Sequence, residues 1–348
     1  MYLTGIWLQH FRSIEDKVWQ FTPGRNLFVA PNGSGKSNLI EAIRLLSTGH
    51  SWRTRKTNEL ISWNQELARL QGKLKKGDGE ELSLEQMLTN GVLQGKRTAQ
   101  RTYRMNGVNK RQSSVVGELA TVLFTPEEME VFQAGPSARR HLLDEVLIQT
   151  DRQYRLSLKQ YEQGLRRRNK LIMQLREHQV DRYDFFYWDQ LLVEHGGYIH
   201  EKRKEFLAWL TEQPGIRESY QIVYDHSTIT EERIRQYATA EVSAGHTLVG
   251  PHKDDLQIHV ERGGEWRDIT TFGSRGEQRL SLLWFKLQEV QWLQDKLSDK
   301  PVLLLDDVFS ELDEDNSRYL LEATTDLQSI ITTVPGQEIL PGEAQELL

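Results

Sequence analysis

A glycine-rich turn between an apolar run and an amphipathic segment dominates residues 26–46, which read N-L-F-V-A-P-N-G-S-G-K-S-N-L-I-E-A-I-R-L-L. Residues 27–29 predict a short buried strand, and apolar residues recur at helical spacing from Leu39 to Leu46. Pro31 and the glycines after it interrupt the strand. The pattern therefore predicts a strand, a tight turn and a helix whose N-terminus points outward.

The turn has the composition of a phosphate loop. Gly33 and Gly35 let successive backbone N–H groups face one concavity, where they and the helix dipole hold phosphate oxygens. Lys36 adds a cation for the β and γ phosphates, and Ser37 adds a hydroxyl ligand for Mg²⁺. The expected ATP-binding residues are Ala30, Pro31, Asn32, Gly33, Ser34, Gly35, Lys36, Ser37 and Asn38. Ala30 replaces the first glycine of G-x-x-x-x-G-K-[ST], and the alternative interpretation is a glycine-rich turn with an incidental lysine.

Composition restricts the class of protein. The 348 residues are 38% hydrophobic and 27% charged, which is typical of a soluble globular protein. No apolar run reaches membrane-spanning length and the N-terminus does not resemble a signal peptide, so we expect a cytoplasmic protein without a membrane partner. The absence of cysteine excludes disulfides and thiolate zinc sites. A net charge of −6 requires any nucleic-acid contact to come from local patches.

The order of patterns predicts an ATPase head with an insertion. Strands are expected at residues 2–11, 17–21 and 121–124, with short strands and an Asn-Gly hairpin within residues 67–111. Residues 126–239 are almost wholly helical in pattern, with two long helices folded back on one another. Strands resume near Val242. The expected division is residues 1–125 for the N-terminal part of the head, 126–240 for a helical lobe and 241–348 for the C-terminal part of the head.

Basic residues gather in three places, each of which has a plain alternative as a solvated face. A hairpin region without acidic residues is the first candidate for DNA phosphates, a loop after the phosphate-loop helix is the second, and a helical cluster at residues 166–170 is the third. The DNA-binding candidates of the first two are Arg53, Arg55, Lys56, Lys96, Arg97, Arg101, Arg104, Lys110 and Arg111.

The apolar run at residues 302–305 predicts a buried parallel strand that ends in two carboxylates, Asp306 and Asp307. Parallel strands deliver such residues to the carboxyl edge of the sheet, where the phosphate loop also lies. Asp306 is then placed to hold Mg²⁺, and Asp307 to orient or deprotonate the attacking water. The alternative is a pair of carboxylates that cap a helix.

Two further loops bear candidate functional groups. His252, Asp254 and Asp255 follow Gly250-Pro251, and they are either a metal site or a brace for the nucleotide loop or the lobe. Ser274 and Gly276 open a helix that is expected to end near Leu297. This offers a second phosphate-facing helix terminus.

Four segments resemble the RecF family of bacterial recombination-repair ATPases, of the ABC and SMC-like class. They are residues 11–12 with 30–38, residues 124–127 with 135–144, residues 250–255, and residues 274–279 with 303–313. The middle two resemble RecF in particular. The resemblance implies an α/β fold, that of an ABC-type P-loop ATPase head with an inserted antiparallel helical lobe.

The resemblance also implies an ATP-dependent homodimer on DNA. The signature loop acting across the dimer would be Ser274, Arg275, Gly276, Glu277 and Gln278, and the D-loop Ser310, Glu311, Leu312 and Asp313. The expected cofactors are ATP and Mg²⁺. The expected partners are DNA, as gapped duplex or at single-strand/double-strand junctions, and RecR- and RecO-like mediators. The protein is expected to help load a RecA-type recombinase and to be required for the damage (SOS) response.

Departures from the ABC pattern favour slow hydrolysis, and we expect DNA to stimulate it. Arg275 replaces a glycine, no glutamine occupies the region of Phe124 to Pro126, and Thr332 and Thr333 stand where many relatives have a histidine. Two other functions remain possible on sequence. The ATP-binding subunit of a membrane transporter would leave the helical insertion unexplained, and a nuclease-linked ATPase would need a further acidic cluster after the head.

Overall fold

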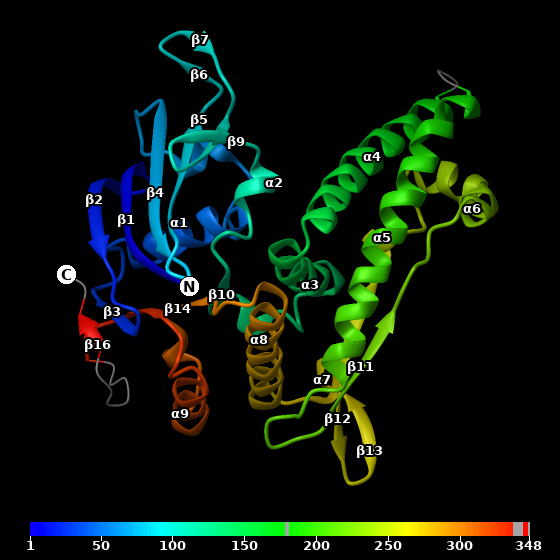
Figure 1. Cartoon of the computed structure of the whole chain (residues 1–348). Coiled ribbons are helices and arrows are strands. Elements are labelled where there is room, and N and C mark those ends of the chain that lie inside the picture. The colour runs from blue at the N-terminus through cyan, green and yellow to red at the C-terminus, as the bar shows by residue number, and fades with distance from the viewer. Residues whose placement is uncertain (178–180, 337–343, 347–348) are drawn as a thin grey trace. The chain divides into compact units, whose positions relative to one another are not determined.

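The computed structural model describes residues 1–177, 181–336 and 344–346. The chain divides into two compact units, which we call the head (residues 1–129 and 282–348) and the lobe (residues 130–281). Residues 241–281 therefore belong to the lobe and not, as expected, to the head. Figure 1 shows the elements of both units.

The strands of the head range from two to ten residues in length. They are β1 (Tyr2–Phe11), β2 (Ile14–Gln20), β3 (Arg25–Val29), β4 (Leu67–Lys75), β5 (Glu81–Thr89), β6 (Val92–Leu93), β7 (Lys96–Arg97), β8 (Arg101–Met105), β9 (Val108–Lys110), β10 (Thr121–Phe124), β14 (Val302–Asp306), β15 (Ser329–Thr333) and β16 (Ala344–Glu346). Its helical segments are α1 (Lys36–Thr48), η1 (Thr57–Leu60), α2 (Gln112–Val115), η2 (Glu128–Glu130), η5 (Val308–Ser310), α9 (Glu314–Ala323) and residues 282–297 of α8 (Arg275–Leu297).

Two sheets enclose the core of the head. The six-stranded sheet has the order β2-β1-β4-β5-β8-β9 with antiparallel pairs, and the five-stranded sheet has the order β10-β14-β15-β3-β16 with parallel pairs. Helix α1 packs against strands of both sheets, and all its residues from Leu39 to Thr48 are buried. Its polar residues Glu41 and Arg44 are buried as well, and both bond to neighbouring groups. The phosphate loop is therefore attached to a helix that is held on all sides by the core of the head.

The lobe combines helices with a small sheet. Its elements are α3 (Pro136–Thr150), α4 (Arg152–Arg176), η3 (Arg182–Phe185), α5 (Phe186–Thr211), β11 (Tyr220–Asp225), α6 (Glu231–Ala244), η4 (Pro251–Lys253), β12 (Asp255–Arg262), β13 (Glu265–Asp268), α7 (Ile269–Phe272) and the first residues of α8. Helices α4 and α5 run side by side, as predicted (Figure 1).

Two local predictions for the lobe are wrong. Strand β11 lies inside the region expected to be helical, where it pairs with β12 through contacts such as Ile222 opposite Ile258. Helix α6 covers residues 231–244, so strands do not resume at Val242 but at Asp255. Strand β11 was missed because its partner is distant in sequence, whereas the restart of the strands was misplaced because α6 is followed by turns and by η4 before β12 begins. Among the described residues, no helix combines the length and the apolarity needed to cross a membrane.

Candidate nucleotide site

The phosphate loop has the predicted form. Strand β3 ends at Val29, and Gly33 (φ 82°) and Gly35 (φ 95°) take left-handed conformations before α1 begins at Lys36. Glycine adopts this region without the steric cost that a Cβ imposes. The first turn of α1 contains no acidic residue, so its N-terminal partial charge is available to an anion.

The two carboxylates lie at the carboxyl edge of the parallel sheet, directly beside the phosphate loop. The Ser37 hydroxyl donates to Asp306 Oδ1 at 3.1 Å, and Lys36 Nζ lies 3.2 Å from Asp307 Oδ1. Lys36 Nζ also donates to Asn32 Oδ1 at 3.4 Å. Residues that are 269 and 271 positions apart in the chain thus form one site, as the strand pattern predicted.

Asp306 is buried and held by hydroxyl groups. Besides Ser37, it accepts a bond of 2.6 Å from the hydroxyl of Thr332, which lies next to it on the parallel strand β15. Burial raises the pKa of Asp306, although both hydroxyl bonds act in the opposite direction. This role of Thr332 was not predicted from the sequence. The feature that could have indicated it is a hydroxyl residue near the end of a second parallel strand, at the position where many relatives have a histidine.

Asp307 has a strained backbone. Its φ of 51° lies in the left-handed region, which is costly for a residue with a Cβ. Its N–H donates to the Thr332 hydroxyl at 3.2 Å, and its carbonyl accepts from the Ser310 hydroxyl at 2.7 Å. Backbone strain of this kind persists only where surrounding contacts hold it and is concentrated at functional sites. In this backbone conformation, the side chain of Asp307 reaches Lys36.

A second charged network supports the start of α1. Arg12 makes a bidentate ion pair with the fully buried Glu41 at 2.7 and 2.9 Å, and Arg53 lies 3.4 Å from the same carboxylate. Arg53 also donates to Asn38 Oδ1 at 3.0 Å, and Asn38 donates to Ser13 at 2.8 Å. The guanidinium of Arg53 therefore positions the phosphate-loop helix, whereas the sequence analysis assigned it to DNA.

The signature loop is a capped helix terminus in the lobe. The Ser274 hydroxyl accepts from Glu277 N–H at 3.3 Å while Glu277 Oε2 accepts from Ser274 N–H at 2.7 Å, which is a capping box. Arg262 pairs with Glu277 at 2.7 Å, and this bond together with the bonds from Ser274 lowers the pKa of Glu277 to about 2. Gln278 is buried, but Ser274 and Gly276 are exposed and accessible to a ligand.

Comparison with known proteins identifies the family. The model of the RecF/RecN/SMC N-terminal domain matches residues 2–344. The DNA replication and repair protein RecF of Caldanaerobacter subterraneus subsp. tengcongensis is 32% identical over 353 residues, covering 95% of this chain and 94% of that protein. The chain belongs to the RecF family.

Solved structures agree with this RecF assignment. The recombination mediator protein RecF-ATPrS of the RecFOR pathway matches with a TM-score of 0.88 at 31% identity, covering 99% of this chain and 95% of that one. An SMC head bound to the C-winged helix domain of ScpA matches with a TM-score of 0.51 at 18% identity, covering 97% and 90%, which shows a shared fold. The predicted fold class, an α/β head of ABC type, is therefore confirmed.

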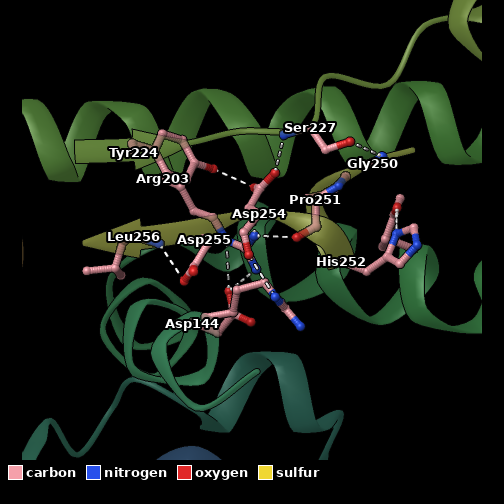
Figure 2. Close-up of polar contacts among 12 residues, drawn as sticks. Asp144, Arg203, Tyr224, Ser227, Gly250, Pro251, His252, Asp254, Asp255 and Leu256 are labelled. Carbon is pink, nitrogen blue, oxygen red and sulfur yellow. Dashed lines mark hydrogen bonds and ion pairs between the residues drawn. The ribbon is translucent and has the colours of Figure 1, made fainter. Parts of the chain in front are cut away.

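The loop at residues 250–255, one of the segments that resembled RecF, is part of a buried ion network in the lobe (Figure 2). Arg203 of α5 lies 2.9 Å from Asp254 and 2.8 Å from Asp144 of α3. Asp254 also accepts bonds from the Tyr224 hydroxyl at 2.5 Å and from Ser227 N–H at 2.8 Å. Carboxylates buried this deeply need such partners. The network joins α3, α5 and β11.

Asp255 and His252, the other polar groups of this loop considered as metal ligands, also bond to side chains and backbone of the lobe. Arg139 is bidentate to Asp255, at 2.8 Å to each oxygen. His252 accepts from the Tyr161 hydroxyl through Nδ1 at 2.7 Å and donates from Nε2 to the Thr247 carbonyl at 3.1 Å. Each side chain of this trio already has hydrogen-bond or ion-pair partners within the lobe. These contacts favour the brace over the metal site.

The other basic candidates of this RecF-family chain differ in whether their side chains bond to groups of the protein. Arg101 donates to Thr57 Oγ1 at 3.1 Å and to the Gly49 carbonyl, so it joins β8 to the loop after α1. Arg104 lies 3.6 Å from Glu85. The candidates with exposed side chains on the head are Arg53, Arg55, Lys56, Lys96, Arg97, Arg104, Lys110 and Arg111, and of these Lys56 lies 3.0 Å from Glu59. In the helical cluster, Arg168 is buried against Asp189 and Glu241.

The expected D-loop follows Asp307 without a break. Segment η5 includes Ser310, and Asp313 caps α9 by accepting from Asn316 N–H at 2.7 Å. Glu311 and Leu312 lie between them. The bond from Ser310 to the Asp307 carbonyl connects this segment to the nucleotide site of its own head.

Proposed function

We propose that this chain is an ATP-dependent DNA-binding protein of recombinational repair and replication, in which ATP acts as a switch. The observation that carries the proposal is the pairing of Lys36 with Asp307 and of Ser37 with Asp306 at one helix N-terminus. The relatives support the DNA-repair part, since they include DNA replication and repair proteins RecF and a RecF structure with ATP.

The residues of the site have separable roles. Lys36, which is 4% exposed, exchanges its bond to Asp307 for phosphate oxygens when ATP binds. Asp307 is then free to orient a water or to accept its proton. The hydroxyl of Ser37 and the carboxylate of Asp306 are hard oxygen donors of the kind that Mg²⁺ takes, and they already lie together. Mg²⁺ there supplies charge neutralisation at the β and γ phosphates.

We extend the proposal to an ATP-dependent homodimer. Ser274 and Gly276 are exposed at the N-terminus of α8, a terminus that favours an anion, which supports a contact with the ATP held by Lys36 of a second copy. The further proposal is that the closed dimer binds gapped DNA and acts with RecR- and RecO-like partners to load a RecA-type recombinase. The similar RecF of known structure, a recombination mediator in the RecFOR pathway, supports this extension. Thr332 in place of a histidine supports slow hydrolysis.

The test measures ATP binding, hydrolysis and association for two variants with matched controls. We expect Lys36→Ala to lose ATP binding, and Asp307→Asn to bind ATP, fail to hydrolyse it and accumulate as a dimer in size-exclusion chromatography. Lys300→Ala and Asp326→Asn are the controls, because these residues are 52% and 89% exposed. An Asp307→Asn protein that binds ATP and stays monomeric contradicts the dimer switch.

A further inference from the structure

A polar hollow lies at one end of the six-stranded sheet of the head. It has a volume of about 330 Å³ and lies between the end of β1, the turn before β4 and the hairpin β6–β7. The side chains that matter for its chemistry are Gln9, His10, Asn64, Gln65, Arg69 and Gln94. Four of these carry amides, each of which offers a donor and an acceptor. The hollow therefore suits a ligand with hydrogen-bonding groups along its edge.

The backbone around this hollow is strained in three places. His10 (φ 52°), Asn64 (φ 62°) and Gln94 (φ 49°) are non-glycine residues in the left-handed region, and all three line the hollow. Local bonds hold them: Ser62 N–H donates to the His10 carbonyl at 2.8 Å, and Gln94 N–H donates to Glu66 Oε2 at 2.9 Å. For Gln94 this conformation is the one that the two-residue turn between β6 and β7 requires, so the hairpin holds Gln94 in place at the hollow.

An exposed tryptophan belongs to the turn that contributes Asn64 and Gln65 to the lining of the hollow. Trp63 is 94% exposed and immediately precedes Asn64 in the turn, where Gln65 N–H bonds to the Ser62 carbonyl at 3.1 Å. A fully exposed tryptophan gains nothing from burial in the fold, and stacking on another planar group would remove its faces from water. In sequence, Trp63 directly precedes two of the amide-bearing residues, Asn64 and Gln65.

Three exposed cations lie on elements that contribute to the hollow or on the hairpin strand paired with one of them. Lys96 and Arg97 are exposed on β7, and Leu93 pairs with Lys96 in the hairpin that carries Gln94. Arg69 is exposed on β4. Glu66 is the acid that lines the hollow, and one of its oxygens is bonded to the Gln94 N–H. Figure 1 shows β6 and β7 beyond the end of β5, where an extended polyanion has access to them.

We propose that this hollow binds an unpaired nucleobase of DNA, with Trp63 stacked on the base and Lys96 and Arg97 on the adjoining phosphates. The proposal rests on the DNA-binding function above and specifies where a single-stranded segment is recognised. Aromatic stacking next to a basic strip is how proteins bind single strands, because every base offers a flat face. Bases in a duplex are paired and stacked, so the hollow selects gaps and junctions over intact duplex.

The test compares binding of a fluorescently labelled single-stranded oligothymidine and of a blunt duplex, by anisotropy in the presence of ATP. We expect Trp63→Ala to weaken single-strand binding by roughly 5- to 150-fold, the range for loss of one base–aromatic stack. Trp63→Phe should restore most of it, and duplex binding should stay within about twofold. Trp266→Ala is the matched control, since Trp266 is 44% exposed on β13 of the lobe. The exposure of Trp63 makes unfolding of the variant a minor risk, and circular dichroism checks it.

A base analogue gives a direct readout. A single strand that contains one 2-aminopurine should change its fluorescence on binding the wild-type protein, and this change should vanish in Trp63→Ala. Equal single-strand affinity for Trp63→Ala and wild type overturns the nucleobase site and leaves the DNA-binding function standing. An equal loss on duplex and single strand also overturns it, because Trp63 would then belong to a general DNA surface. A wild-type protein that binds neither DNA contradicts the proposed function itself.

Discussion

Protonation of His252 should destabilise the lobe in mild acid. Both ring nitrogens are used in the neutral form, because Nε2 donates to Thr247 and Nδ1 accepts from Tyr161. A charged imidazole would carry a proton on both nitrogens, so Nδ1 could no longer accept from the Tyr161 hydroxyl and the direction of that bond would have to reverse. Burial lowers the pKa of His252 from its usual 6.5 to about 4, and nearby Lys253, Arg140 and His246 add to this effect.

The size of the effect follows from the two pKa values. The unfolded chain binds the proton near pH 6.5 and the folded protein only near pH 4, so the stabilisation is complete above pH 6.5 and is lost as the pH falls toward 4. At pH 5 the loss amounts to about 2 kcal/mol relative to pH 7.5. This is a substantial part of the stability of an ordinary domain.

The measurement is urea unfolding of wild type and His252→Gln at pH 7.5 and pH 5.0, followed by far-UV circular dichroism. Glutamine keeps a donor and an acceptor but does not titrate. The free-energy gap between the two proteins should therefore shrink by about 2 kcal/mol at the lower pH, since other titrating groups cancel in the comparison. A gap that is the same at both pH values would refute the assignment of a neutral, proton-excluding His252.

Two further predictions concern association and DNA. Ser274→Arg should abolish the ATP-dependent dimer in size-exclusion chromatography, because the larger side chain blocks the exposed helix terminus. Each monomer should still bind ATP. A parallel loss of ATP affinity would place Ser274 in the nucleotide site of its own subunit. Neutralising Lys110 and Arg111 together should reduce the slope of log K against log salt concentration for duplex DNA by up to about 0.9 for each phosphate that the variant no longer neutralises. Lys300→Ala serves as the control, and an unchanged slope would mark the hairpin as a solvated face.

Local patterns predicted the elements that build the nucleotide site. The strand before Ala30, the glycine turn, the helix from Lys36 and the strand that ends at Asp306 all depend on apolar periodicity and on residues a few positions apart. The rule that parallel strands meet at their carboxyl edge then brought Asp307 to the phosphate loop without any knowledge of contacts. Strand β11 was missed because its partner β12 begins 30 positions after it ends, so flanking helices dominated the pattern.

The roles of the arginines were not predictable from charge alone. Arg53, Arg101 and Arg168 stand in runs that read as DNA-binding faces, yet each guanidinium bonds to groups inside its own unit. Arginine satisfies buried carboxylates and carbonyls as well as it binds phosphates, so its function depends on which of these the fold brings within reach. Lys96 and Arg97 stay candidates for DNA phosphates, because both are exposed and their cross-strand neighbours on β6 are apolar.

In the candidate nucleotide site, Lys36 and Asp307 serve as counterions for each other. Lys36 is almost fully buried, and an unpaired ammonium there would be costly, so Asp307 takes the place that a phosphate occupies when ATP binds. ATP must therefore displace the Asp307 carboxylate from Lys36. Asp307→Asn removes this competitor, and binding of a non-hydrolysable ATP analogue should become tighter by up to about fivefold, which corresponds to about 1 kcal/mol for a partly exposed pair.

Isothermal titration calorimetry with wild type, Asp307→Asn and the exposed control Asp326→Asn measures the change. The control should match wild type, because Asp326 is 89% exposed and is not part of the site. Weaker binding of the analogue by Asp307→Asn would mean that the carboxylate aids nucleotide binding, for example through the metal. In that case the pair of Lys36 and Asp307 would not be a competitor of the phosphate, and the trapping of the dimer would need another cause.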